Sequence, residues 1–212
     1  MAMVRRVAVT ILRHGLTAAN QQKQYIGLHN PSLCKEGIKE INRLKEELMF
    51  PAADVVISSD RNRCVETSRI LYPDQAIITS GSFCEIHFGK WEGKTYEELK
   101  HHPHYQKWID DPSQYQPPEG ESLSEFERRL ELGWQTELIS YFEKEHVNHI
   151  VLITHGGPIR YYLSKLGPAN YMWTWKTGHG EGYTFFWDRE ELRSGKRCIS
   201  LQAVPFMARQ NG

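Results

Sequence analysis

The stretch VAVTILRHG, residues 7–15, carries an apolar, β-branched segment directly into Arg13, His14 and Gly15. A short continuous apolar run is typical of a strand that is covered on both faces of its sheet. The arginine and histidine then come where the strand ends, and glycine lets another group approach the backbone closely. We therefore expect a chemical site at the carboxyl end of this strand.

Five further short runs predict the rest of the sheet. The segments DVVIS at 54–58 and IVLIT at 150–154 are rich in β-branched residues, and each ends in polar residues. Segments 76–79, 183–187 and 199–203 are weaker strand candidates, and the last two would form a hairpin. The sheet would therefore be mixed but mostly parallel.

Apolar residues at helical spacing lie between these runs. One stripe covers residues 38–48, and a longer one covers residues 123–141. Pro158 suits the first turn of a third helix, which would end at Gly167. Strands that alternate with helices predict an α/β fold, here a three-layer sandwich whose central sheet is flanked by helices.

Residues 84–121 break this alternation. The segment is rich in aromatic residues, proline, histidine and glycine, and only a short helix at 95–101 is predicted in it. Long irregular segments inside compact domains are usually functional. We expect a single domain over residues 1–212, in which this segment forms a small cap over the active site. Its aromatic side chains would offer a wall to the leaving group: Tyr96, Tyr105, Trp108 and Tyr115.

Charge and composition exclude several classes of partner. The 212 residues include 26 Lys plus Arg and 26 Asp plus Glu, which leaves no bulk electrostatic case for nucleic acid or an anionic membrane. The N-terminal apolar run is too short for a signal peptide, and no segment has the roughly 18 apolar residues of a membrane helix. Four scattered cysteines, at positions 34, 64, 84 and 198, fit reduced thiols in the core. We expect a cytoplasmic protein, with the choice between monomer and homodimer open.

Three of the predicted strands end in residues suited to binding an anion. The carboxyl ends of parallel strands meet at one edge of a sheet, so residues 13–14, 58–59 and 155–157 should share a pocket. Arg63, from the helix after the second of these strands, and Asn20 would join them. Guanidinium groups, imidazole N–H groups and helix N-termini all donate hydrogen bonds to phosphate. The pocket therefore predicts a phosphate group as its ligand.

Histidine can also attack phosphorus as a nucleophile. His14 would lie among cations, which should lower its pKa and leave the imidazole neutral at neutral pH. The arginines would stabilise charge on the phosphoryl oxygens. The departing alkoxide needs a proton from a separate acid, and Glu85, at the start of the cap, is the best candidate.

Five motifs follow one another in a family-specific order over nearly the whole chain. They are L-R-H-G-x-T-x-x-N at 12–20, S-S-D-x-x-R-C-x-E-T at 58–67, C-E-I-H-F-G-K-W-E-G at 84–93, P-P-E-G-E-S at 117–122 and I-T-H-G-G-P-I-R at 153–160. This ordered set resembles the histidine phosphatase superfamily, which has the phosphoglycerate-mutase-like fold. The resemblance implies a mixed sheet sandwiched by helices and a reaction that needs no metal or other cofactor.

The resemblance also implies a role for each motif residue. His14 would be phosphorylated, Asn20 would assist, and Glu85 would protonate the leaving group and later act as a base toward water. Three side chains would grip the phosphoryl group: Arg13, Arg63 and His155. Thr17 and Gly156 would contact the substrate.

Two features refine the expected activity. Leu16 stands where the family usually has Glu or Gln, so we expect altered pocket packing or substrate preference. The spacing from Glu85 to His155 is shorter than in cofactor-dependent phosphoglycerate mutases, which favours hydrolysis over mutase action. The segment FGKWEGKTYEEL, residues 88–99, is most similar to the branch that contains α-ribazole phosphatases and broad-specificity phosphatases.

The sequence thus predicts a histidine acid-type phosphatase, a metal-independent enzyme that hydrolyses small phosphorylated metabolites through a phosphohistidine. Three alternatives stay open: a dedicated α-ribazole-5′-phosphate phosphatase, a phosphoglycerate-type mutase, and a non-catalytic module that binds phosphorylated ligands. A metal site at residues 101–104 is disfavoured because adjacent histidines point in different directions. Trp173 and Trp175 either pack on the sheet or mark an association surface. His179 is either an ordinary loop residue or part of the pocket rim.

Overall fold

The computed structural model describes residues 6–167 and 177–206, and Trp173 and Trp175 lie outside these ranges. In the described part of the chain the strands form a six-stranded sheet of order β3-β2-β4-β1-β5-β6. The strands are β1 (Arg6–Arg13), β2 (Val55–Ser59), β3 (Ile77–Ser80), β4 (His149–Thr154), β5 (Gly182–Asp188) and β6 (Ser200–Val204). The first four run parallel to one another, and β5 and β6 add antiparallel pairs. The predicted mixed, mostly parallel sheet is confirmed.

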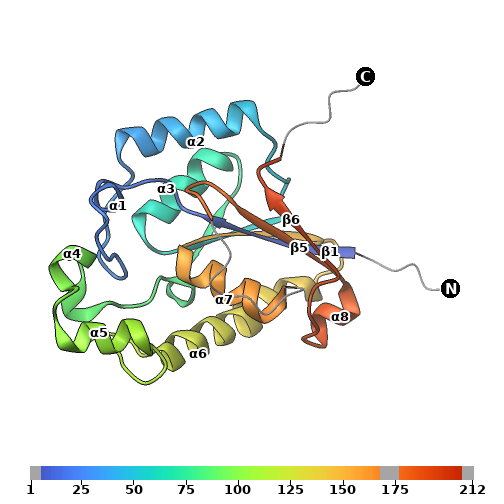
Figure 1. Cartoon of the computed structure of the whole chain (residues 1–212). Coiled ribbons are helices and arrows are strands. Elements are labelled where there is room, and N and C mark those ends of the chain that lie inside the picture. Colours follow the sequence, from blue (N-terminus) through green and yellow to red (C-terminus); the bar gives the residue numbers. More distant parts are fainter. Residues whose placement is uncertain (1–5, 168–176, 207–212) are drawn as a thin grey trace.

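Helices cover both faces of the sheet (Figure 1). On one face lie α2 (Lys35–Glu47) and α3 (Asn62–Leu71), and on the other lie α6 (Leu123–Gly133) and α7 (Gly156–Leu166). The shorter helices are α1 (Ala18–Gln21), α4 (Tyr96–Leu99), α5 (Pro103–Asp110) and α8 (Arg189–Arg193). The architecture is the expected three-layer α/β sandwich.

One helix differs from the sequence prediction. The helix expected over 123–141 is α-helical only as far as Gly133, a residue of low helix propensity, and goes on as a π-helical and then a 3₁₀ segment to Glu143. The strands β5 and β6 are antiparallel neighbours, which confirms the predicted hairpin, and the short helix α8 lies in the connection between them.

The apolar strand residues alternate between two cores. Val9 and Ile11 of β1 pack in the core on the α6 and α7 side, which includes Leu130. Leu12 packs in the opposite core with Ile41 of α2. Burial of such a side chain is worth about 1.5–3 kcal/mol, so both faces of the strand resist displacement. This double burial holds the end of β1 in place.

The cap, residues 84–121, has a small core of its own. It contains α5, which the sequence analysis did not find, in addition to the expected helix α4. The core joins four buried side chains: Phe88, Trp91, Leu99 and Tyr105. Tyr105 and Trp108 therefore pack within the cap, while Tyr96 is 53% and Tyr115 37% exposed. Tyr105, which was predicted to belong to an aromatic wall facing the leaving group, therefore lies in the interior of the cap.

None of the helices in residues 6–167 and 177–206 combines the length and the apolar character that a bilayer crossing requires.

Candidate active site

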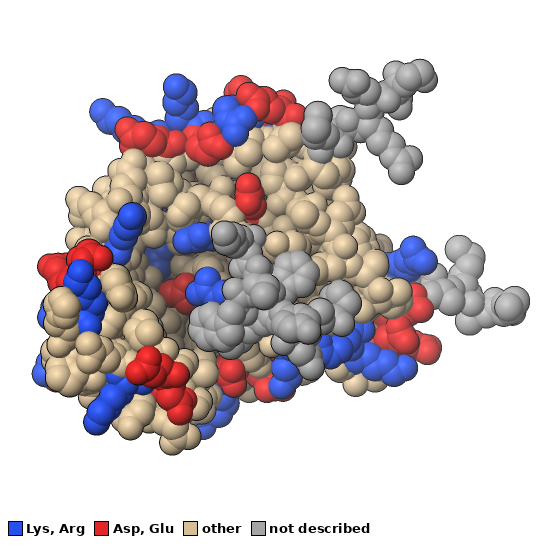
Figure 2. Space-filling model, viewed as in Figure 1, with Lys and Arg blue, Asp and Glu red and all other residues tan. Residues whose placement is uncertain are grey.

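The register between β1 and β4 brings two histidines together. Arg13 pairs with Thr154, and the His14 N–H donates to the Thr154 carbonyl at 3.0 Å. His14 and His155 follow these residues, and their ring centroids lie 5.1 Å apart. Figure 2 shows a hollow near the point where β1 ends and α7 begins, with basic and acidic side chains inside it. The strand ends thus meet where the parallel sheet requires.

His14 is held as a neutral imidazole with one defined tautomer. Its side chain is buried, and Nδ1–H donates to the Gly15 carbonyl at 2.6 Å. Because a carbonyl oxygen only accepts, Nδ1 carries the hydrogen and Nε2 carries the lone pair. Burial first, and then the nearby Arg63 guanidinium, hold the pKa of His14 well below its usual range. The ring therefore presents an unprotonated Nε2 at neutral pH.

Arg63, in the first turn of α3, is fully buried. Its Nη1 donates to the His29 carbonyl at 2.8 Å, and its Nη2 donates to the Gly27 carbonyl at 2.9 Å. Its Nε–H donates to Nδ1 of His155 at 3.3 Å. Nη2 also reaches the Ile26 carbonyl at 3.5 Å. These contacts fix the plane of the guanidinium, and Nη1 keeps a second N–H for another acceptor.

A buried carboxylate holds the loop that supplies those carbonyls. The side chain of Glu92 is 6% exposed and accepts hydrogen bonds from the N–H groups of Gly27, Leu28 and His29 at 3.0–3.2 Å. It also accepts from the Phe88 N–H at 3.0 Å. Hydrogen bonds to an ionised acceptor are the stronger kind. Glu92, which the sequence analysis did not single out, therefore positions Arg63 through the loop.

His155 is the N-cap residue of α7 and is 1% exposed. Its Nδ1 accepts from Arg63, so the neutral ring carries its hydrogen on Nε2, which donates to Ser59 Oγ at 2.9 Å. Burial first, and then Arg63, hold the pKa of His155 well below its usual range. Both ring nitrogens therefore have protein partners.

Arg13 brings a second guanidinium to the site. Its Nη1 donates to the Thr177 carbonyl at 2.8 Å, while its buried Nε has no hydrogen-bond partner among the described residues. Gly156 lies beside it, since a Cβ built there would lie 3.9 Å from Arg13 Cζ and Nε. A buried N–H without an acceptor is costly, so an incoming anion would satisfy it.

Glu85 lies at the N-terminal end of α7. Its Oε2 accepts from the Gly157 N–H at 2.9 Å, and its Oε1 accepts from the Ile86 N–H at 3.0 Å. A Cβ built on Gly157 would lie 2.0 Å from Glu85 Oε1, so only glycine leaves room for the carboxylate. The α7 terminus therefore carries both His155 and the group that holds Glu85.

A family model described as "Histidine phosphatase superfamily (branch 1)" matches residues 9–193. The chain belongs to the histidine phosphatase superfamily. The resemblance carried by the five motifs is thereby confirmed.

Two related proteins and one solved structure show what this histidine phosphatase superfamily member is similar to. The adenosylcobalamin/alpha-ribazole phosphatase of Escherichia coli (strain K12) is 26% identical over 176 residues, which is 80% of this chain and 85% of that protein. Phosphoserine phosphatase 1 of Hydrogenobacter thermophilus is 29% identical over 167 residues, covering 76% of this chain and 77% of the relative. The crystal structure of the alpha-ribazole phosphatase from Shigella flexneri has a TM-score of 0.74 and 25% identity, and covers 84% of this chain and 89% of that one. Together they support a phosphoric monoester hydrolase that acts on small phosphorylated metabolites.

Thr17 and Asn20 form a capping box at the start of α1 in this histidine phosphatase. Thr17 Oγ1 accepts from the Asn20 N–H at 3.2 Å, and Asn20 Oδ1 accepts from the Thr17 N–H at 3.2 Å and from its hydroxyl at 2.9 Å. This capping box occupies Asn20 Oδ1 and leaves the Asn20 amide N–H groups as donors. Substrate contact by these two residues stays a prediction.

His179, which the sequence left as a loop or rim residue, lies against the nucleophile candidate. Its Nδ1–H donates to the His14 carbonyl at 3.0 Å, and the two ring centroids are 5.4 Å apart. Burial first, and then Arg13, lower the pKa of His179 to about 4. The signal in the sequence was the glycine-rich turn before β5, but only the fold shows that this turn reaches β1.

Arg160 is a further cation at the site that the sequence analysis did not assign. It lies one turn into α7, and its Nη1 is 3.4 Å from the Cβ position built on Gly156, close to Arg13. It has neither a hydrogen bond nor an ion pair within the described ranges of the chain. The sequence could have indicated Arg160, because it is the last residue of the motif at 153–160. It follows Gly156 by four residues and so lies on the same face of the helix.

Leu16, two residues after His14, makes its contacts near the site through its backbone carbonyl. Its carbonyl accepts from the Cys34 N–H at 3.1 Å, and a Cβ built on Gly37 would lie 2.1 Å from that oxygen. Leu16 therefore ties the loop after His14 to the start of α2, and its half-buried side chain carries no hydrogen-bonding group. Its expected effect on substrate preference stays a prediction.

The histidines of residues 101–104 have other partners. The His102 ring accepts from the His104 N–H at the start of α5, and the His104 ring donates to the Gln116 carbonyl at 2.8 Å. Over residues 6–167 and 177–206, no group of three or more His, Cys, Asp or Glu side chains has an arrangement that could hold a metal ion. These histidines serve local structure in the cap.

Proposed function

We propose that this protein hydrolyses phosphate monoesters of small metabolites through a phosphohistidine formed on His14. The observation that carries the proposal is the fixed tautomer of His14, whose Nδ1–H is held by the Gly15 carbonyl while Nε2 keeps its lone pair. A neutral imidazole with a defined free nitrogen is what attack on phosphorus requires. Arg13 and Arg63 stand beside it to bind the phosphoryl oxygens.

In the first step His14 Nε2 forms a bond to phosphorus while the bond from phosphorus to the ester oxygen breaks. The Nε–H of Arg13, which has no partner among the described residues, and the second N–H on Arg63 Nη1 donate to the phosphoryl oxygens, where charge develops. Glu85, in its protonated form, gives its hydrogen to the leaving oxygen. The alcohol departs, and the phosphoryl group stays on His14.

In the second step water attacks the phosphorus and the bond to Nε2 breaks. Glu85, now a carboxylate, accepts the proton from water, which restores the acid for the next cycle. Inorganic phosphate leaves, and His14 returns to its neutral form. The Gly157 N–H keeps the carboxylate in place through both steps.

His155 supports the phosphoryl site through Arg63 in this proposal. Its Nδ1 accepts from Arg63, and its Nε2–H is committed to Ser59. A direct hydrogen bond from His155 to a phosphoryl oxygen would require Nε2–H to exchange Ser59 for that oxygen. The neutral ring suits this position because Arg63 repels a second positive charge.

Arg160 favours a substrate with a second anionic group. It lies beside Arg13 at the start of α7 and has no partner in the described part of the chain. A carboxylate or a second phosphate on the substrate would pair with it through a charge-assisted hydrogen bond. Among the substrates named for relatives, phosphoserine carries such a carboxylate, and α-ribazole-5′-phosphate is the contrasting case.

The test measures phosphate release from p-nitrophenyl phosphate, phosphoserine, 3-phosphoglycerate and α-ribazole-5′-phosphate in the presence of EDTA. We expect hydrolysis that survives EDTA and disappears in His14→Ala, with an acid-labile phosphoryl group trapped on the wild-type protein. Transfer of label between two sugar-acid positions would identify the mutase. Binding of these compounds without phosphate release would identify the binding module. The cytoplasmic location, the single-domain organisation and the oligomeric state stay predictions from the sequence.

A further inference from the structure

The side chains behind His155 form a hydrogen-bond chain with one direction. Arg63 Nε–H can only donate, so His155 Nδ1 is an acceptor and the hydrogen of the neutral ring lies on Nε2. That hydrogen is donated to Ser59 Oγ at 2.9 Å. Ser59 therefore receives a hydrogen bond from His155, and its own hydroxyl hydrogen must point elsewhere.

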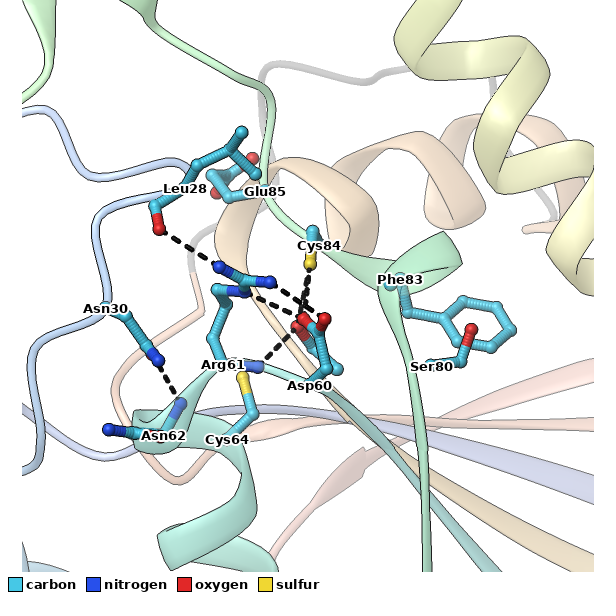
Figure 3. Close-up of polar contacts among 12 residues, drawn as sticks. Leu28, Asn30, Asp60, Arg61, Asn62, Cys64, Ser80, Phe83, Cys84 and Glu85 are labelled. Carbon is cyan, nitrogen blue, oxygen red and sulfur yellow. Dashed lines mark hydrogen bonds and ion pairs between the residues drawn. The ribbon is translucent and has the colours of Figure 1, made fainter.

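Cys84 takes up the chain from Ser59. Ser59 Oγ lies 3.3 Å from Cys84 Sγ, and Cys84 Sγ lies 3.0 Å from Asp60 Oδ1. A carboxylate oxygen only accepts, so the thiol donates to Asp60 and accepts from Ser59. Figure 3 shows Cys84 pointing toward Asp60 from the segment that also carries Glu85. Each link then donates in the same sense, from Arg63 to Asp60.

The far end of the chain is fixed by an ion pair. Arg61 Nε donates to Asp60 Oδ1 at 2.7 Å, and Arg61 Nη2 donates to Oδ2 at 2.8 Å (Figure 3). Hydrogen bonds from Arg61, first, hold the pKa of Asp60 below its usual range. The chain therefore ends on an ionised, immobilised acceptor, while Ser59 and Cys84 are buried.

We propose that Asp60 and Cys84 are positioning residues that keep His155 in its Nε2–H tautomer and thereby keep Arg63 aimed at the phosphoryl group. If Ser59 lost its acceptor, its hydroxyl could turn and donate to His155 Nε2. The ring hydrogen would then move to Nδ1, facing the Arg63 Nε–H, and two donors would oppose each other across 3.3 Å. The link to phosphoryl binding rests on the proposed function, whereas the tautomer does not.

A serine substitution separates this role from core filling. If Cys84 only fills space, Cys84→Ser and Cys84→Ala should lose activity alike, because neither side chain restores the volume of the sulfur. If Cys84 relays the hydrogen bond, Cys84→Ser keeps a group that accepts from Ser59 and donates to Asp60, and Cys84→Ala does not. The two roles therefore predict different results for the same pair of variants: similar losses if Cys84 fills space, and recovery in Cys84→Ser alone if it relays the hydrogen bond.

The experiment reads the tautomer of His155 by two-bond ¹H–¹⁵N NMR of the full chain without ligand, with the signal assigned through His155→Gln. We expect one Nε2–H tautomer in the wild type and in Cys84→Ser, and a mixture in Cys84→Ala and Asp60→Ala. We expect kcat/KM to fall about tenfold in Cys84→Ala, as when outer partners of ligating histidines are removed, and to recover in Cys84→Ser. The matched control is Cys198→Ala, because Cys198 is buried in the main core and takes no part in the hydrogen-bond chain from Arg63 to Asp60.

A single Nε2–H tautomer in Cys84→Ala, or a Cys84→Ser variant no more active than Cys84→Ala, would overturn the proposal. If Cys84→Ala shows a tautomer mixture but the wild type hydrolyses no phosphate monoester, the hydrogen-bond chain is supported and the proposed function is refuted. The NMR readout and the activity readout therefore fail separately.

Discussion

A methyl group on Gly157 tests whether Glu85 is the proton donor. A Cβ at this position would lie 2.0 Å from Glu85 Oε1, whereas real Cβ contacts essentially never fall below 3.0 Å. The carboxylate must therefore shift by about 1 Å, because the other neighbour of the new methyl is Phe126 Cζ at 3.2 Å. The shift also weakens the hydrogen bond from the Gly157 N–H, now 2.9 Å long.

A displacement of about 1 Å in a reacting group costs about 100-fold in rate, or roughly 2.7 kcal/mol in the barrier. We expect this loss in kcat/KM for phosphoserine, whose alkoxide leaving group requires a proton. The loss should be much smaller for p-nitrophenyl phosphate, because nitrophenolate leaves without prior protonation. The ratio between the two substrates therefore isolates the acid step from general damage to the site.

The assay is steady-state kinetics of Gly157→Ala on both substrates, with thermal unfolding measured in parallel. Gly81→Ala serves as the control, because among the described residues its new Cβ would meet only Asp60 Oδ2, at the ordinary contact distance of 3.6 Å. An equal loss on both substrates, or full activity on phosphoserine, would refute the assignment of Glu85 as the acid.

Three further predictions follow from buried or unpaired charges. The pKa of His179 is lowered to about 4 in the folded chain, from an ordinary value of 6.5, so between these values only the unfolded chain holds the proton. The free energy of unfolding should therefore fall as the pH decreases from about 6.5 to about 4. In His179→Gln, the free energy of unfolding measured by urea titration at each pH should depend less on pH. Glu92→Gln should lose about 1–3 kcal/mol in urea unfolding and also lower kcat/KM, because buried N–H groups lose their charged acceptor and Arg63 is loosened. Glu119→Gln, at a carboxylate whose side chain is 71% exposed, should leave both quantities unchanged. Arg160→Ala should raise KM for phosphoserine by about tenfold and leave KM for p-nitrophenyl phosphate unchanged, whereas equal effects on both would refute a second anion site.

The sequence carried the fold because its strands are apolar on both faces. Runs such as 7–12 and 150–154 can be satisfied only between two layers of helices, and polar residues directly after them must lie at the sheet edge. That rule, with the spacing of the motifs, is enough to predict that His14 and His155 share one pocket. The helix α5 and the end of α6 were not found, because the cap's aromatic packing and the transition to π and 3₁₀ geometry depend on contacts between distant residues.

The sequence by itself determined the family, the strand ends and the kinds of side chain that gather there, because these depend on local pattern and order. Only the tertiary structure decided how those side chains are held. Glu92 reaches Arg63 through a loop more than 60 residues away in the chain, and Cys84 reaches His155 through Ser59. Hydrogen bonds of this kind depend on direction and on distances of about 3 Å, which residue type and spacing do not specify. The tautomers of the two histidines, and the chemistry that follows from them, are therefore properties of the fold.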